Sequence, residues 1–176
     1  MSENDLVDLQ VGADNCLRPA IMLLEDAEVL LKKEGYLSCF VLSQLALEEL
    51  AKGHMLITKH LKKETFSRKE WESLTRGKAA HLNKLAIIQE VEEKWIGPDL
   101  FAAVGKQKEV AKYLYDSRYG ILYVDYDFEK KQWIDPMRDQ VINGMSVDAK
   151  LCFPNISRVR LHLQLLKKLL KGEIGK

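Results

Sequence analysis

The residues best placed to do chemistry are charges in the middle of an apolar segment. Leu45–Leu56 reads LALEELAKGHML, and apolar residues continue on both sides of it. Wound at about 100° per residue, this segment is apolar in nearly every direction, which is typical of a helix buried by its neighbours. Glu49 falls within that apolar surface, with Glu48 and Lys52 near it. Because an isolated buried charge is very costly, we expect Glu49 to be paired with a basic group elsewhere in the chain.

Three basic residues are candidates to bind Glu49. His81 and Lys84 are three residues apart in a later helical segment, so they can face the same neighbour. Arg118 ends another helical pattern and precedes a tyrosine-rich run that includes Tyr123. An arginine can hold a carboxylate with two parallel hydrogen bonds. A site built from these side chains would combine an acid–base group with cations.

Each of these residues also has a purely structural interpretation. Glu49, Lys52 and Arg118 are equally consistent with a buried ion-pair network that fixes how the helices align. Glu48 and Lys52 have the spacing of an ordinary pair within one helix. A tyrosine such as Tyr123 usually packs against other side chains, and an aspartate such as Asp125 often caps a turn.

The sequence predicts neither a metal nor a cofactor. His54 and His60 are six residues apart and fall on different helix faces. No histidine follows Glu48 or Glu49 three residues later, so the motif of a carboxylate-bridged di-iron site is absent. There is no glycine-rich phosphate loop.

Composition indicates one soluble helical domain spanning residues 1–176. The chain is 47% apolar and 30% charged, and its formal net charge of +1 argues neither for nor against nucleic acid. Its three cysteines have no short pairing, and Cys16 and Cys39 are expected to be buried free thiols. No signal peptide and no apolar run of about 20 residues is present, so we expect a cytoplasmic protein without a membrane segment.

Helical periodicity predicts a bundle of about five main helices. Residues 1–12 are expected to be flexible, and Ser67 and Glu70 resemble a capping box that begins one further short helix. Residues 124–153 are expected to be an irregular arm, and the segment near 121–135 either a short β-hairpin or an extended, irregular excursion. The main helices are expected at Asp14–Lys33, Tyr36–His60, His81–Lys94, Asp99–Ser117 and Asn155–Lys171, the last of these closing the chain at 155–171.

Four motifs in one order resemble the AbiV family, whose members are abortive-infection phage-defence proteins with a HEPN-type helical fold. They are A-L-E-E-L-A-K from Ala46 to Lys52, H-x-x-K from His81 to Lys84, R-x4-Y-V-D from Arg118 to Asp125, and W-x-x-P from Trp133 to Pro136. The resemblance covers roughly Ala13 to Pro136. It implies an all-α domain that is commonly dimeric and, in many members of the HEPN group, a metal-independent ribonuclease.

The usual HEPN motif, an arginine followed after four to six residues by a histidine, is not intact here. Arg118 is followed after four residues by Tyr123, and Arg158 reaches His162 after only three. If RNA is cleaved, another general base is required.

RNA cleavage without a metal needs a general base and a cation, and the motif residues can be given these roles. Arg118 and Lys84 would neutralise phosphate, and His81 would do acid–base work, because histidine titrates near neutral pH. Tyr123 would donate a proton, while Glu49 and Lys52 would support the site, with Asp125 close to it.

Two functions follow as alternatives. In the first, the protein is a dimeric effector in phage defence that cleaves RNA or impairs translation. In the second, it is a non-catalytic HEPN-type module that senses a phage protein or another partner, with residues 121–154 as the contact surface.

Overall fold

The part of the chain that the structure describes contains five helices and four short strands. The structure is a computed structural model, and it describes residues 8–96, 125–127, 131–134, 141–142, 145–146 and 149–174. The predicted all-α helical bundle is confirmed. The helices are α1 (Leu9–Lys32), α2 (Tyr36–Lys62), α3 (Arg68–Thr75), α4 (Gly77–Ile96) and α7 (Ala149–Leu170).

Helix α1 begins earlier than the sequence predicted. The Asp8 side chain accepts hydrogen bonds from the backbone N–H groups of Gln10 and Val11, at 3.1 and 3.0 Å, and so caps the helix. Residues from Leu9 onward are therefore helical, although 1–12 were expected to be flexible. Pro19 consequently lies in the helix interior rather than in the first turn.

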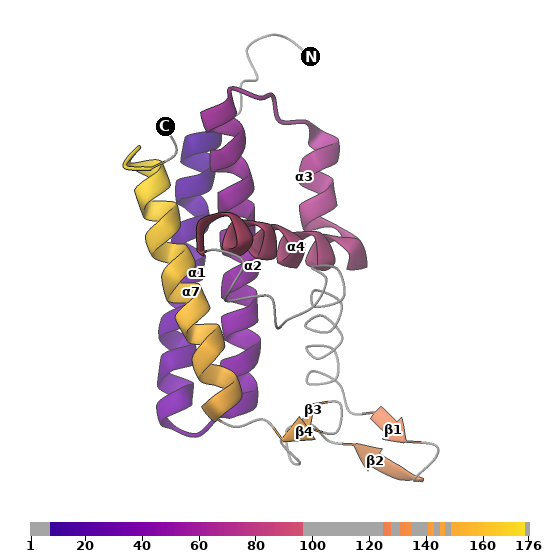
Figure 1. Cartoon of the computed structure of the whole chain (residues 1–176). Coiled ribbons are helices and arrows are strands. Elements are labelled where there is room, and N and C mark those ends of the chain that lie inside the picture. Colours follow the sequence, from indigo (N-terminus) through magenta and orange to yellow (C-terminus); the bar gives the residue numbers. More distant parts are fainter. Residues whose placement is uncertain are drawn as a thin grey trace.

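The bundle is built on the antiparallel pair of α1 and α2. Helix α7 packs along both of them, and α4 crosses α2 and contacts α3 (Figure 1). Helix α2 is covered on several sides, as its apolar circumference predicted, and Leu47, Leu50 and Ala51 are fully buried. The three cysteines are buried free thiols, as expected for Cys16 and Cys39.

Gly53 allows three helices to approach closely. A Cβ atom at this position would lie 2.6 Å from Cδ2 of Leu166 in α7 and 3.3 Å from Cβ of Cys16 in α1. Leu166 has no exposed surface, so it has little room to move away. Because residue 53 has no side chain, α1 and α7 can both pack closely against α2 at this position.

Helix α7 is longer than predicted. It starts at Ala149 instead of Asn155 and continues through Pro154, so residues 149–153 belong to the helix and not to the irregular arm. Its inner face supplies buried residues to the core, among them Ile156, Val159 and Leu166. The bundle is closed by a segment that is distant in sequence from the helices it covers.

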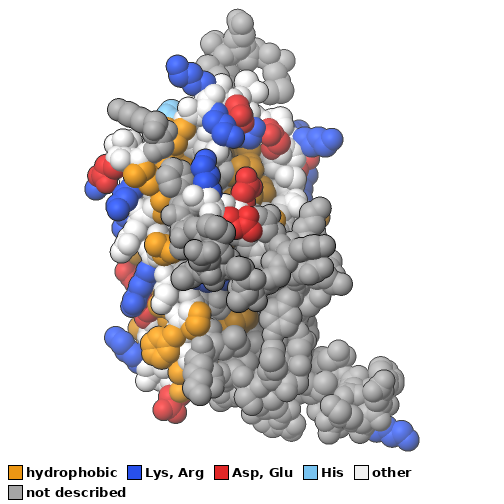
Figure 2. Space-filling model, in the orientation of Figure 1, with side chains coloured by type: hydrophobic (Ala, Val, Ile, Leu, Met, Phe, Trp, Pro, Cys, Tyr) orange, Lys and Arg blue, Asp and Glu red, His pale blue; other side chains and the backbone are white. Residues whose placement is uncertain are grey.

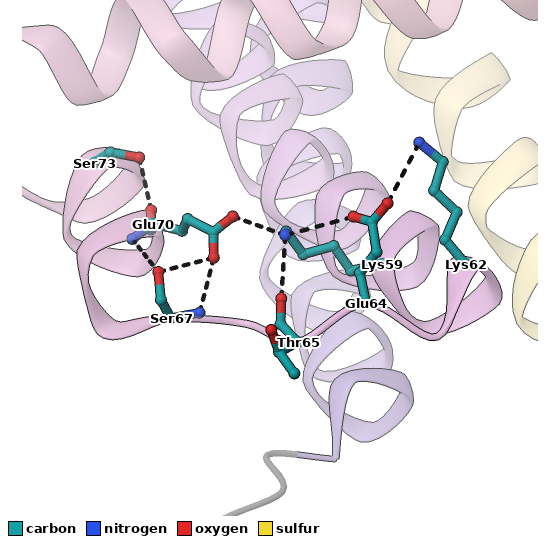
Figure 3. A network of polar contacts seen from close by, with 7 residues as sticks. All are labelled: Lys59, Lys62, Glu64, Thr65, Ser67, Glu70 and Ser73. Atoms are coloured by element: carbon teal, nitrogen blue, oxygen red, sulfur yellow. Dashed lines mark hydrogen bonds and ion pairs between the residues drawn. The ribbon is translucent and has the colours of Figure 1, made fainter.

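The short helix α3 is fixed at its start by polar contacts. The predicted capping box is confirmed: the Ser67 hydroxyl accepts from the Glu70 backbone, and the Glu70 carboxylate accepts from the Ser67 backbone N–H at 2.8 Å. Lys59 at the end of α2 binds Glu70 at 2.7 Å (Figure 3). These bonds hold the pKa of Glu70 low, at about 2. The loop between α2 and α3 is thus fixed at both ends.

Of the two forms expected for the segment near 121–135, the structure shows the hairpin. Strands β1 (Asp125–Asp127) and β2 (Gln132–Ile134) pair antiparallel, with Tyr126 opposite Trp133. A second short pair, β3 (Val141–Ile142) with β4 (Met145–Ser146), was not predicted. The predicted helix Asp99–Ser117 lies outside the described residues.

Charges of both signs are interspersed on the surface. Figure 2 shows basic and acidic side chains with hydrophobic ones between them. Several basic residues are paired with carboxylates, including Arg158 with Glu92 and Arg160 with Glu28. Within the described residues, no helix is long and apolar enough to cross a membrane.

Candidate functional site

The buried carboxylate of α2 is Glu48, not Glu49. The side chain of Glu48 is 3% exposed and faces α4, whereas that of Glu49 is 25% exposed. The prediction that Glu49 is the buried charge is therefore wrong by one residue. Because α2 is apolar almost all round, its sequence cannot show which side a polar neighbour covers; the crossing of α4 decides this.

Glu48 joins the two motif residues of α4. Its Oε2 accepts a hydrogen bond from Nδ1 of His81 at 2.7 Å and forms an ion pair with Nζ of Lys84 at 2.5 Å. Lys84 is nearly buried, while the His81 side chain is 30% exposed. The structure thus brings together the A-L-E-E-L-A-K and H-x-x-K motifs. A contact between these two helices was predicted from the sequence.

This arrangement orients the imidazole. When Nδ1 of His81 donates its hydrogen to the Glu48 carboxylate, acid–base chemistry by His81 passes through the other ring nitrogen, Nε2. Glu48 and Lys84 are buried, so this pair lies on the core side of His81. The geometry is that of a carboxylate–histidine pair at the border between core and solvent.

Gln44 lies one turn before Glu48 on the same side of α2. It is 2% exposed, and its amide has no hydrogen-bond partner among the described residues. Sequence reasoning missed Gln44, although a glutamine four residues before a buried glutamate in an apolar helix is a usable signal.

Glu49 and Lys52 form a separate pair. Nζ of Lys52 lies 2.6 Å from Oε2 of Glu49, within α2 itself. The predicted pairing of Lys52 with Glu48 is wrong, because Glu48 turns toward α4. Glu49 and Lys52 do not join His81 and Lys84.

The remaining predicted site residues are not placed. Arg118 and Tyr123 lie outside the described residues. Asp125 is described only as the first residue of β1. The roles given to these three residues stay predictions.

A second polar cluster lies between α4 and α7. Glu92 has no exposed surface and is bound by Arg158 through two parallel bonds, Nε to Oε1 at 2.7 Å and Nη2 to Oε2 at 3.0 Å. Nε2 of His162 donates to the same carboxylate at 3.1 Å. Burial acts to raise the pKa of Glu92, but the bonds from His162 and Arg158 outweigh it and lower the pKa.

The cluster continues to His54 of α2. Nδ1 of His162 lies 3.0 Å from Nε2 of His54, and the rings meet at 72°. Burial, with the nearby His162, lowers the pKa of His54 to about 3, so this imidazole is neutral at neutral pH. Nδ1 of His54 has no hydrogen-bond partner among the described residues.

Arg158 and His162 were noted in the sequence only as a poor match to the HEPN spacing. Their spacing of one helical turn puts both on the same face of α7, where they meet Glu92. Glu92 itself occurs in an apolar helical pattern, which is a signal of a buried charge. Nothing in the sequence indicated that His54 would complete the cluster from a third helix.

No group of three or more His, Cys, Asp and Glu side chains in the described residues could hold a metal ion. His54 and His60, which share α2, differ in environment, since His54 is buried and His60 is exposed.

Comparison with known proteins gives one family. The family model HEPN_AbiV, described as AbiV, matches residues 8–146. No curated protein and no solved structure matches the chain. The matched range includes Glu48, His81 and Lys84 and ends before α7.

Proposed function

The chain belongs to the AbiV family, and on that premise we propose that it is an abortive-infection effector that cleaves RNA without a metal ion. Family membership suggests a role in phage defence, and the site on α2 and α4 supports the chemistry. The observation that carries the proposal is the 2.7 Å bond between Glu48 and His81. A carboxylate behind a partly exposed imidazole is the arrangement of an oriented general base.

The proposed step is a transesterification. Nε2 of His81 takes the proton of a ribose 2′-hydroxyl, the 2′-oxygen attacks the adjacent phosphorus, and the bond to the 5′-oxygen breaks. The leaving 5′-oxygen takes a proton, a role that suits Tyr123. Arg118 would stabilise the charge on the phosphorane oxygens. Glu48 orients His81, and Lys84 balances the charge of Glu48.

Ribonuclease assays in EDTA test this proposal. Purified protein is incubated with cellular RNA, beside the variants His81→Ala and Arg118→Ala. We expect cleavage by the wild type and a loss of at least about 100-fold in both variants, the scale of general acid–base catalysis. His60→Ala is the matched control, because His60 is exposed at the end of α2 and should cleave normally. Full cleavage by His81→Ala would overturn the assignment.

We also propose that the effector is a homodimer, as the family resemblance implies. An exposed stripe on α1 supports this: its apolar residues Val11, Met22 and Val29 are 54%, 55% and 49% exposed, with the exposed charges of Arg18 and Glu25 among them. Their spacing is close to whole turns, so they lie on one side of the helix. Exposed apolar residues on one helix face, with charges of both signs beside them, suit contact with a second copy.

One observation favours the non-catalytic alternative. Arg158 and His162, the pair closest to the HEPN spacing in the described residues, are engaged with buried Glu92 and cannot meet RNA as they stand. In that case the protein binds a phage-encoded or other partner protein. Absence of cleavage by folded protein, with a partner recovered from infected cells and lost on deletion of Asp127–Lys131, would favour it.

A further inference from the structure

A cleft opens between α1, α2 and the start of α3, away from the Glu48 site. Its volume is about 610 Å³, within the range of small-molecule sites. Leu56, Phe66 and Trp71 give it apolar walls, while Asn15, Glu49 and Lys52 add polar groups. Glu49 and Lys52 are the family-motif residues that the Glu48 site leaves unused.

The aromatic wall of the cleft, Phe66 and Trp71, is held in place by contacts of its rings and of its backbone. Phe66 and Trp71 meet edge to face, with ring centroids 5.9 Å apart. The capping box at Ser67 and the Lys59–Glu70 ion pair fix the backbone that carries them (Figure 3). Trp71 is nevertheless 38% exposed. A fixed, partly exposed indole beside a cleft offers a stacking surface for a flat ring.

The polar groups can bind an anion. Among the described residues, Lys52 has one ion-pair partner, Glu49, although an ammonium group has three donors. Arg68 lines the cleft, and its Nε donates to Glu72 at 2.9 Å. Its two terminal nitrogens have no acceptor in the described part of the chain. The cleft therefore combines a stacking surface with donors that remain available to a negatively charged group.

We propose that this cleft binds a nucleotide, with the base stacked on Trp71 and the phosphate near Lys52 and Arg68. Asn15 can hydrogen-bond a base edge, because its amide both donates and accepts. The same chemistry is offered by a free mononucleotide and by one nucleotide of an RNA strand. Binding does not depend on RNA cleavage, so this inference goes beyond the proposed function.

Isothermal titration calorimetry of the full chain tests the proposal. The probes are adenosine 5′-monophosphate, ribose 5-phosphate, and a single-stranded adenosine hexanucleotide whose 2′-O-methyl groups prevent cleavage. We expect binding of at least one adenine-containing probe with a Kd below about 1 mM, and none of ribose 5-phosphate. Trp71→Ala should weaken binding about tenfold through lost stacking. Lys52→Met should weaken it by a similar factor through a lost charged hydrogen bond.

Two controls separate the cleft from general effects. Lys69→Met removes a charge from an exposed residue of α3 outside the cleft lining and should bind normally. His81→Ala should bind normally even if it cleaves no RNA, which separates this inference from the proposed function. Trp71→Phe keeps a stacking ring and should retain most of the affinity.

The outcomes are distinct. Binding of the mononucleotide that both cleft variants weaken supports a nucleotide site, and binding of the hexanucleotide alone identifies the source as an RNA strand. Failure of both adenine probes overturns the proposal. So does equal binding of ribose 5-phosphate, or binding that neither Trp71→Ala nor Lys52→Met weakens.

Discussion

Two adjacent glutamates in α2 differ sharply in what surrounds them. Glu48 is 3% exposed and holds two basic side chains of α4, whereas Glu49 is 25% exposed and pairs within its own helix. Removing one partner from a buried pair leaves an uncompensated charge, which costs far more than the loss of a solvated pair.

We therefore expect Glu48→Gln to lower the free energy of unfolding by about 3 kcal/mol, because buried Lys84 loses its carboxylate. Glu49→Gln should cost less than about 1 kcal/mol. Urea unfolding of the two variants beside the wild type measures both. Equal costs would show that the burial of Glu48 does not matter energetically.

His54 makes stability depend on pH. Its pKa is about 3 in the folded protein and about 6.5 when unfolded, so only the unfolded state takes up a proton between these values. Stability then falls as pH drops below about 6.5. Glu92, Arg158 and His162 face His54, and the bonds from His162 and Arg158 hold the pKa of Glu92 below its ordinary value.

Comparison with His54→Gln isolates this effect. Between pH 6 and pH 5 the wild type should lose about 1 kcal/mol more of unfolding free energy than His54→Gln, which cannot titrate. Urea unfolding of both proteins at the two pH values gives the difference. Parallel pH dependence of the two proteins would mean that His54 is protonated in the fold.

The sequence predicted the basic partners of the buried α2 carboxylate correctly, but not which glutamate carries that carboxylate. His81 and Lys84 were found because their spacing places both on one helix face, and they do bind an α2 carboxylate. The choice between Glu48 and Glu49 depends on the crossing of α4, which no local pattern encodes. The Glu92 cluster depends on contacts between residues far apart in the sequence. Glu92 and Arg158 are separated by 66 positions, and His54 and His162 by 108.

At the scale of elements, α7 is attached by two arginines in different environments. Arg158 is 19% exposed and binds buried Glu92 of α4, while Arg160 is 59% exposed and binds Glu28 of α1. The docking of α7 should depend on the first pair far more than on the second.

Arg158→Met should lower the free energy of unfolding by about 3 kcal/mol, because Glu92 stays buried without its two hydrogen bonds from Arg158. Arg160→Met, two residues away on the same helix, should cost less than about 1 kcal/mol. Thermal unfolding of both variants provides the comparison. A small loss for Arg158→Met would indicate that His162 alone satisfies Glu92.

Helix ends were less predictable than helices. The core periodicity located α1, α2, α4 and α7, but the true start of α1 depends on the Asp8 cap, and α7 runs through Pro154. The capping box of α3 was predicted correctly, because both of its partners lie within four residues.

At the scale of the molecule, the exposed stripe of α1 predicts the oligomeric state. Sedimentation at micromolar concentration should show a dimer, and Met22→Glu should shift it to monomer, because a charge would be buried in the contact. Leu161→Glu alters an exposed apolar residue of α7, outside the stripe, and should remain dimeric. A dimer that survives Met22→Glu would place the contact elsewhere.

The late position of α7 has a consequence for the synthesis of the protein. His54 and His162 are 108 residues apart, so at 5–20 residues per second about 5 to 20 s pass between their appearance on the ribosome. During that interval the side of α2 that α7 covers is unprotected, and Glu92 lacks both donors. The growing chain is therefore most vulnerable to aggregation and proteolysis before α7 emerges. Any activity that requires the closed bundle begins only after that helix has docked.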